Sequence, residues 1–395
     1  MSGFGHYPGT AFSNESQNDT IPIVISSHYI GIDIGIGLGA KIGLFRNTNV
    51  VEAEALLATE KYGKTYESFA ASLEEAIEKL LSENKLTAVD LRSIGIACAG
   101  ILNSDGSFFL VANFKQLNGH NLKARLEETF GIPVGIENDA NAGALAEWSV
   151  LRLELIYWVF GGGWGGAWVD RNGIIQFPVM DWDGEDKNLH LTNEPGYAIP
   201  LEKLLLKTLF NEMSASYELY ERIVVAELDP PGGVLLGPGG NPDTIRAELI
   251  LSGPGRLRLF RALVGDDDFY QRFLDTSEHA EMDDPAKAGK YIDKLSNMRV
   301  EAAVNTDRLY GKVLARATRN MLKQAFADGM PEGLPICLGG KPSYALPYFG
   351  PSAQRALARL GMYNYMRPSV IDERGSNANL IGSAVLAKNI ADQAE

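Results

Sequence analysis

One short segment near the middle of the chain most constrains the fold. An apolar run at 133–136, typical of a β-strand, passes directly into Glu137, Asn138 and Asp139 and then into small residues as far as Glu147. A strand that ends in polar residues and continues as a small-residue helix is typical of an α/β protein, in which the helix packs closely on a neighbour. Asp139 is therefore expected at the N-terminus of a helix and facing a cleft.

Two roles fit Asp139. A carboxylate at this position can take the proton of a substrate hydroxyl, which is what phosphoryl transfer to an alcohol requires of its general base. It can equally be a helix N-cap, which satisfies free backbone amides and contributes about 1 kcal/mol. The segment by itself leaves both roles open.

The first ordered segment predicts a hairpin. Residues 29–33 and 41–45 are strand-like and flank a glycine-rich turn that contains Gly35, Gly37 and Gly39. The spacing of Gly35, Gly37 and Ala40 also satisfies the loose dinucleotide-binding fingerprint. That fingerprint requires a helix after the glycines, whereas 41–45 alternates like a strand, so the hairpin is favoured.

A second glycine run lies between the strand-like segments 156–160 and 167–169. Five of the six residues at 161–166 are glycine. Without Cβ atoms, backbone amides can approach phosphate oxygens closely, so this run is a candidate phosphate loop. A bulged hairpin with no ligand is the alternative.

Taken together, these segments resemble the ROK family (repressor, open reading frame, kinase). The resemblance rests on Glu-Asn-Asp-Ala-Asn at 137–141, the glycine run at 161–166 and the small-residue segment at 380–384. It covers most of 29–200 and returns at 338–340, whereas 205–300 has no matching motif. It implies an ATP-dependent sugar kinase with a two-lobed α/β fold of the actin-like ATPase (ribonuclease H-like) type and an interlobe cleft.

The resemblance also implies site residues. Asp139 would be the general base, Asn138 and Glu194 would bind sugar hydroxyls, and Asp33 would hold a magnesium ion through the nucleotide. The implied sugar pocket comprises Gly100, Asn113, Asn138, Asp139, Glu194 and Tyr197. The implied ATP site comprises Asp33, Gly35, Gly37, Gly39, Gly161, Gly162, Gly163, Gly339 and Gly340. Asn113 fits a buried turn equally well, and Glu194 fits an ordinary surface charge.

The chain departs from the family pattern at three places. Ile36 replaces a glycine of the first phosphate loop, which also has no threonine, and Gly162 replaces the threonine of the second loop. Tyr197 replaces the histidine of a Glu-x-Gly-His motif, in which the histidine binds sugar and can ligate zinc. The only two cysteines, Cys98 and Cys337, lie in separate apolar runs, so no zinc site is predicted.

Composition limits the partners. A formal net charge of -14 argues against nucleic acid, because phosphate binding needs a concentrated basic face. No apolar run approaches the roughly 20 residues of a membrane span, and no signal peptide is evident, so a cytoplasmic protein is expected. Residues 1–27 are polar and glycine-rich, which is typical of a disordered tail.

The 395 residues favour two lobes. The first is expected from 28–135 plus 378–395, and the second from 136–377 with an insertion around 205–300. The favoured function is a carbohydrate kinase that uses magnesium and ATP. A sugar-binding protein that keeps the fold and has lost the activity is the alternative, because both phosphate loops lack their hydroxyl. The sugar and the oligomeric state stay open, with a homodimer as one option.

Overall fold

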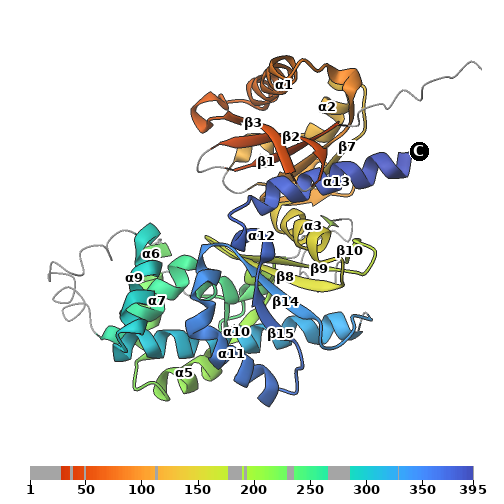
Figure 1. Cartoon of the computed structure of the whole chain (residues 1–395). Helices are drawn as coiled ribbons and strands as arrows, with labels where there is room; N and C mark the ends of the chain where they lie inside the picture. The colour runs from red at the N-terminus through yellow and green to blue at the C-terminus, as the bar shows by residue number, and fades with distance from the viewer. Residues whose placement is uncertain are drawn as a thin grey trace, which may run out of the picture.

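The fold is described from a computed structural model of the chain (Figure 1). The structure describes residues 28–35, 39–48, 50–111, 114–176, 189–190, 194–228, 235–265, 285–327 and 329–394. The predicted tail at 1–27 and the candidate site residues Gly37 and Asn113 lie outside these ranges.

The first lobe is built on a five-stranded sheet of order β3-β2-β1-β4-β7. Its strands are β1 (His28–Ile34), β2 (Ala40–Asn47), β3 (Val50–Leu57), β4 (Leu91–Cys98) and β7 (Val134–Asn138). Strand β1 pairs antiparallel with β2, with Asp33 opposite Lys41, and parallel with β4. The predicted hairpin is confirmed, and the dinucleotide-binding alternative is excluded because a strand follows the glycines.

Helices α1 (Tyr66–Glu83) and α2 (Leu122–Phe130) belong to this lobe. Helix α1 begins at a capping box between Thr65 and Ser68, and its apolar stripe includes the fully buried Phe69 and Leu73. A small sheet at the lobe edge has the order β11-β5-β6. Its strands are β5 (Ile101–Asn103), β6 (Phe108–Leu110) and β11 (Leu189–His190).

The second lobe repeats the strand pattern of the first. Its sheet has the order β10-β9-β8-β14-β15, in which β8 pairs antiparallel with β9 and parallel with β14. The strands are β8 (Leu155–Phe160), β9 (Trp164–Val169), β10 (Ile175–Gln176), β14 (Pro335–Gly339) and β15 (Tyr365–Pro368). In each lobe three antiparallel strands therefore start the sheet and two later strands extend it in parallel, which confirms the predicted two-lobed α/β class.

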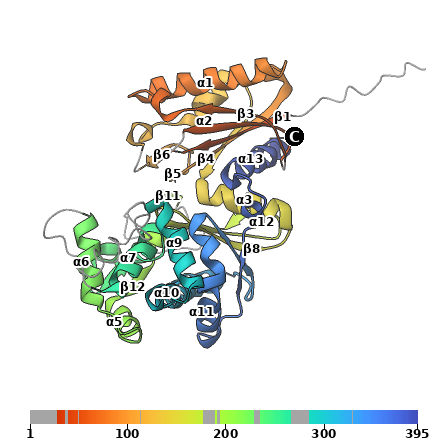
Figure 2. The same cartoon turned by 60° about the vertical axis from the view of Figure 1, so that its left-hand side comes forward.

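Helices cover the second sheet on its outer side (Figures 1 and 2). They include α5 (Lys203–Asn211), α6 (Tyr217–Leu228), α7 (Gly253–Val264), α9 (Pro285–Asn297), α10 (Glu301–Ala327) and α11 (Leu346–Arg359). The segment 205–300, which has no recognised motif, supplies Phe210, Tyr220 and Leu259 to the core of this lobe. The described part of this segment therefore contributes to the structural core. It also contains β13 (Thr244–Arg246), which pairs with β12 (Pro200–Glu202).

Two helices join the lobes. Helix α3 (Asp139–Leu151) follows β7 and packs on β8 and β9, and α13 (Ala378–Ala394) returns to pack on β1 and β4. Figure 1 shows α13 lying along the first lobe and against α3. The approach is so close that a Cβ at Gly382 would lie 1.7 Å from the Ala142 carbonyl oxygen, and one at Gly95 would lie 1.9 Å from the Ser383 carbonyl oxygen.

A buried carboxylate fixes the chain between the lobes. Glu147 of α3 is fully buried and accepts hydrogen bonds from the Ser369 hydroxyl at 2.8 Å and the Val370 amide at 2.9 Å. These donors start the short helix α12 (Val370–Glu373), which leads into α13. Cys98 and Cys337 are both buried and unpaired. No helix in the described ranges combines the length and apolar character needed to cross a bilayer.

Candidate active site

Asn138 is the hub of the segment between β7 and α3. It is fully buried, and its side-chain oxygen accepts a hydrogen bond from the Ala140 amide at 2.8 Å, so Asn138 is the N-cap of α3. Its amide nitrogen donates to the Gly100 carbonyl oxygen at 3.1 Å and to Glu194 Oε1 at 3.2 Å. One side chain therefore connects the first lobe, the start of α3 and Glu194 of the second lobe.

Asp139 is the first residue of α3 and lies where the lobes meet. One of its carboxylate oxygens accepts from the Ala140 amide at 2.9 Å. Burial, and then the nearby Asp33 carboxylate, raises the pKa of Asp139 to about 6, although the Ala140 amide opposes the rise. Because Asn138 already caps the helix, the Asp139 carboxylate is available to a ligand.

Glu194 lies near Asp139 and near a third carboxyl group, that of Glu248. Burial, followed by the charge of Asp139, raises the pKa of Glu194 to about 8, and the hydrogen bond from Asn138 opposes this. Glu248 also contributes to that rise, and burial raises its own pKa, opposed by Arg246 and Arg258. A buried carboxyl group whose ionisation is disfavoured by two others is typical of a polar functional site.

The second glycine turn lies beside these acids. A Cβ at Gly163 would lie 3.1 Å from Glu248 Oε2, whereas Gly161 and Gly162 have open space at the Cβ position. The Gly161 carbonyl oxygen accepts from the Gly253 amide, at the start of α7, at 2.9 Å. Gly340 has a φ of +81°, and a Cβ there would lie 2.0 Å from the Phe160 carbonyl oxygen. The turns at 161–163 and 339–340 are therefore neighbours, as two parts of one nucleotide site would be.

Asp33 approaches the site from the first lobe. It is the second-last residue of β1, and its carboxylate accepts from Asn377 Nδ2 at 2.8 Å and from Asn379 Nδ2 at 3.3 Å. The glycine turn after it is shaped by Gly39, whose φ is +119° and where a Cβ would lie 2.1 Å from the Leu57 carbonyl oxygen. The Gly35 carbonyl oxygen accepts from the Tyr62 hydroxyl at 2.7 Å.

Tyr197 is paired with Arg246. The guanidinium carbon lies 3.7 Å from the ring centroid, and Arg246 Nη2 donates to the Tyr197 hydroxyl oxygen at 2.8 Å. Tyr197 lies in α4 (Pro195–Ala198), directly after Glu194, and Arg246 ends β13 just before Glu248. The stacked pair therefore cross-links the two short elements that present these acids.

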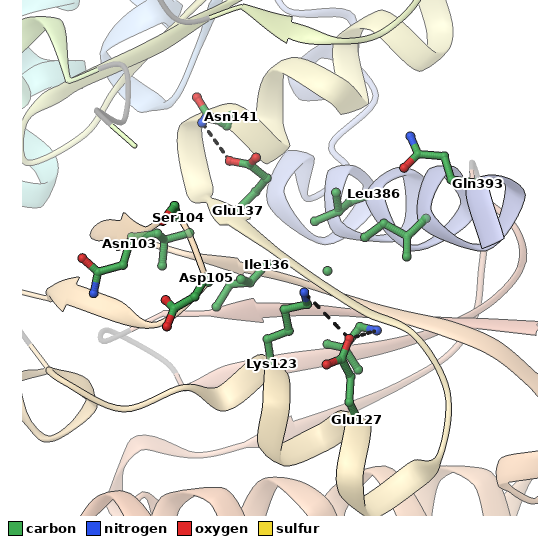
Figure 3. A pocket seen from close by; sticks show the side chains of 15 residues that line it. Asn103, Ser104, Asp105, Lys123, Glu127, Ile136, Glu137, Asn141, Leu386 and Gln393 are labelled. Atoms are coloured by element: carbon green, nitrogen blue, oxygen red, sulfur yellow. Dashed lines mark hydrogen bonds and ion pairs between the residues drawn. The ribbon is translucent and has the colours of Figure 1, made fainter. Parts of the chain in front are cut away.

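A pocket of about 380 Å³ lies beside β7 and the start of α3 (Figure 3). Glu137 and Asn141 lie together at one end of it, and Asn141 Nδ2 donates to Glu137 Oε2 at 2.9 Å. The same oxygen accepts from the Asn138 amide at 3.3 Å, and burial raises the pKa of Glu137. Asp139 does not line this pocket. Glu137 therefore contacts Asn138 from the side of the pocket, and the surface to which it belongs is not the one that contains Asp139.

The comparisons with known proteins match part of the chain. Residues 29–176 match the ROK family. A putative xylose repressor from Caldicellulosiruptor sp. (strain Rt8B.4) is 31% identical over 184 residues, which are 45% of this chain and 39% of that protein. A glucokinase from Halalkalibacterium halodurans is 28% identical over 172 residues, which are 42% of this chain and 51% of that protein.

The solved structures agree on the fold. A ROK family glucokinase from Streptomyces griseus, in complex with glucose and AMPPNP, superposes with a TM-score of 0.58 at 18% identity, over 92% of this chain and 99% of that one. The match to the ROK family covers residues 29–176, less than half of the chain. The two lobes of the chain have the actin-like ATPase fold of the solved ROK structures. The alignments span about half or less of the length of the curated relatives, which include both a kinase and a repressor.

Sequence reasoning missed three polar residues of this site. Glu248 lies in the segment without a recognised motif, Asn377 directly precedes the C-terminal helix α13, and Asn379 is the second residue of that helix. Their positions are set by contacts with residues far away in the chain. The available signal was weak: Glu248 follows a strand-like run, and the two asparagines lie at the start of a small-residue helix, where polar side chains often act only as caps.

The raised pKa of Glu194 predicts how the stability of this protein depends on pH. The folded protein keeps a proton on Glu194 that the unfolded chain releases above the usual value of 4.5, so stability falls as the pH rises from about 4.5 to about 8. Over that pH range, the free energy of unfolding of Glu194→Gln should fall by about 1 to 3 kcal/mol less than that of the wild type. This figure allows for the residual solvent contact of the side chain. Urea unfolding at pH 5, 7 and 9 measures this.

The matched control for this measurement is Glu202→Gln, an exposed change on β12. It should follow the wild-type dependence on pH. If the free energy of unfolding changed with pH equally in Glu194→Gln and in wild type, Glu194 would ionise in the folded protein as it does in the unfolded chain, contrary to the prediction.

Proposed function

We propose that this protein transfers the γ-phosphoryl group of ATP to a hydroxyl of a sugar, with Asp139 as the general base. The observation that carries the proposal is the place of Asp139. It lies where the lobes meet, is not required as the helix cap, and faces Glu194 together with the buried Asn138. This is the arrangement that deprotonation of a bound alcohol requires.

The proton transfer follows from the charges at the site. A pKa of about 6 leaves the Asp139 carboxylate mainly ionised at neutral pH and still basic enough to accept a proton. As the hydroxyl oxygen bonds to the γ-phosphorus and the bond from that phosphorus to the ADP oxygen breaks, the hydroxyl proton passes to Asp139. Glu194, with a pKa of about 8, is then largely protonated and can donate a hydrogen bond to the sugar.

The acids around Asp139 suit a polyhydroxylated ligand. Asn138 offers an amide, and Glu194 and Glu248 offer carboxyl groups, so neighbouring hydroxyls on one sugar face can each find a partner. The Tyr197 hydroxyl oxygen accepts a hydrogen bond from Arg246. In this proposal Tyr197 therefore holds these groups in place. The glucose complex of the Streptomyces griseus structure supports a sugar as the ligand class.

The glycine turns at 161–163 and 339–340 would hold the nucleotide. Open space beside Gly161 and Gly162 allows phosphate oxygens to approach backbone amides. Asp33 fits the magnesium ion that the family implies, because its oxygens keep lone pairs beyond those used by Asn377 and Asn379. When bound, magnesium would neutralise phosphate charge. Asp33 would bind the ion from the first lobe, and the glycine turns would bind the phosphates from the second.

A sugar-binding protein without turnover is the second candidate. Gly162 provides no hydroxyl to the transferred phosphoryl group, and Tyr197 is held by Arg246 instead of offering an imidazole to the sugar. The experiment is to measure ADP release with magnesium and ATP across hexoses, amino sugars and acylated amino sugars, beside the melting temperature with each sugar. Sugar-dependent ADP release supports the kinase. Sugar-dependent stabilisation without ADP release supports the binding protein.

The donor side gives a separate prediction. Because Gly162 can contact phosphate only through its backbone, Gly162→Thr should raise turnover by about tenfold, which corresponds to one hydrogen bond of roughly 1.4 kcal/mol. ATP affinity in the wild type should be modest and should depend strongly on magnesium. Calorimetry with and without chelator measures this, and tight ATP binding in chelator would contradict the proposed nucleotide site.

A further inference from the structure

A pocket of about 480 Å³ on the outer side of the second lobe is rich in arginine. It lies among α5, α10 and α11, which Figures 1 and 2 place at the end of the lobe opposite the first lobe. Its basic lining residues are Arg308, Lys312, Arg316, Arg355 and Arg359. The only acidic residue that lines it is Glu212.

Most of this positive charge is uncompensated. Glu212 pairs with Lys312, and Arg308 has only a 3.5 Å contact with the Asn305 side-chain oxygen. Within the part of the chain that the structure describes, the guanidinium groups of three residues form no hydrogen bond or ion pair: Arg316, Arg355 and Arg359. Three arginines that converge on one pocket without a protein partner leave their guanidinium donors to solvent or to a ligand.

The spacing of these residues brings like charges together. Arg308, Lys312 and Arg316 are four residues apart along α10, and Arg355 and Arg359 are four residues apart along α11. Like charges at this spacing on a helix destabilise it. In a chain whose net charge is -14, such a cluster also creates a local field of opposite sign to that of the whole protein. Helix stability therefore does not account for the cluster, whereas binding of an anion does.

The walls of the pocket limit the kind of anion. Leu205, Leu209 and Leu360 add apolar surface to the lining of the pocket, and the volume is that of a small-molecule site. The acidic net charge disfavours a long polyanion such as nucleic acid, which would meet repulsion beyond the pocket. Guanidinium groups match phosphate in geometry and in charge.

We propose that this pocket is a second ligand site, which binds a small phosphorylated compound away from the interlobe site. The site is independent of the kinase proposal, because it shares no residue with the proposed catalytic and nucleotide groups. Two sources of the ligand are compatible with the pocket: an organic phosphate ester, whose carbon skeleton would contact the apolar surface, and an inorganic polyphosphate.

The test is calorimetry on the full chain at low ionic strength without magnesium, with inorganic pyrophosphate, tripolyphosphate and glucose 6-phosphate as probes. The triple variant Arg316→Gln, Arg355→Gln, Arg359→Gln should bind the preferred probe at least about tenfold more weakly than wild type. The matched triple variant Lys79→Gln, Lys290→Gln, Lys323→Gln, at exposed lysines outside the pocket, should bind like wild type. Binding should also weaken steeply as salt is added.

The outcomes separate the possibilities. Tighter binding of glucose 6-phosphate identifies an ester site, and tighter binding of the inorganic probes identifies a polyphosphate site. Equal binding by the wild type and the arginine triple variant overturns the proposal, as does equal loss in both triple variants. Self-association of the wild type that the arginine variant loses, without probe binding, also overturns it, because the cluster would then be an interface. If the triple variant does not fold, Arg359→Glu, compared with Lys79→Glu, repeats the test at exposed positions.

Discussion

Replacing Asp139 with asparagine is expected to lower sugar-dependent ADP release by about 100-fold to 10,000-fold. The amide cannot take the hydroxyl proton, whereas the size of the side chain and its acceptor for the Ala140 amide are kept. Sugar binding should survive, because an amide still forms hydrogen bonds with a hydroxyl. Stability should be unchanged at acidic pH and slightly higher above pH 6, where the wild type must hold a buried carboxylate that resists ionisation.

The matched control for this change is Asp170→Asn. Asp170 lies in the turn between β9 and β10, where its carboxylate oxygen accepts from the amides of Asn172 and Ile174, as an asparagine oxygen can. This variant should retain wild-type turnover and melting temperature. If Asp139→Asn retained wild-type turnover as well, the carboxylate would not be the base. A wild-type protein with no turnover on any sugar would favour the binding-protein candidate.

Gly382→Ala is expected to destabilise the protein by about 3 kcal/mol or more. The new Cβ would lie 1.7 Å from the Ala142 carbonyl oxygen, so α13 and α3 would have to move apart along the contact that joins the lobes. A backbone atom cannot rotate away as a flexible side chain can. Chemical denaturation followed by circular dichroism measures the loss. Because α3 begins at Asp139, turnover should also fall in the protein that remains folded.

The same substitution at another helical glycine provides the control. Gly289 lies in α9 with open space at the Cβ position, so Gly289→Ala should be neutral or stabilise the protein by up to about 1 kcal/mol through helix propensity. Opposite signs for the two changes would show that packing outweighs propensity at Gly382. A loss below 1 kcal/mol in Gly382→Ala would mean that the two helices separate at little cost.

The sequence determined the local elements because their signals are short in range. Alternation at 41–45 predicted a strand, and the antiparallel pairing of β1 with β2 confirms it. The small-residue run after Asn138 predicted a helix, and the structure bounds it as α3. Each of these patterns is complete within some twenty residues, because strand and helix periodicity are local properties of the backbone. The position of Asp139 at the start of a helix follows in the same way.

Only the tertiary structure decided which residues share the site. Asparagine favours helix caps, and this preference is all that the residue type indicates for Asn138. In the structure its side-chain amide also contacts Gly100 and Glu194. Glu248 reaches the site because its neighbours Ala247 and Leu249 are buried in the core of the second lobe. Such contacts join residues many positions apart, and no local pattern encodes them.

The repeated strand order of the two lobes is likewise a property of the whole fold. The hairpins β1–β2 and β8–β9 occupy equivalent places in their sheets, although the segments share little beyond glycine-rich turns. Strand pairing over long distances depends on which apolar faces can be buried together, and many sequences satisfy that requirement. The pairing of Arg246 with Tyr197 is of the same kind. Sequence showed that Tyr197 stands where the family has histidine, and folding alone placed a guanidinium against its ring, because β13 and α4 meet only in the packed lobe.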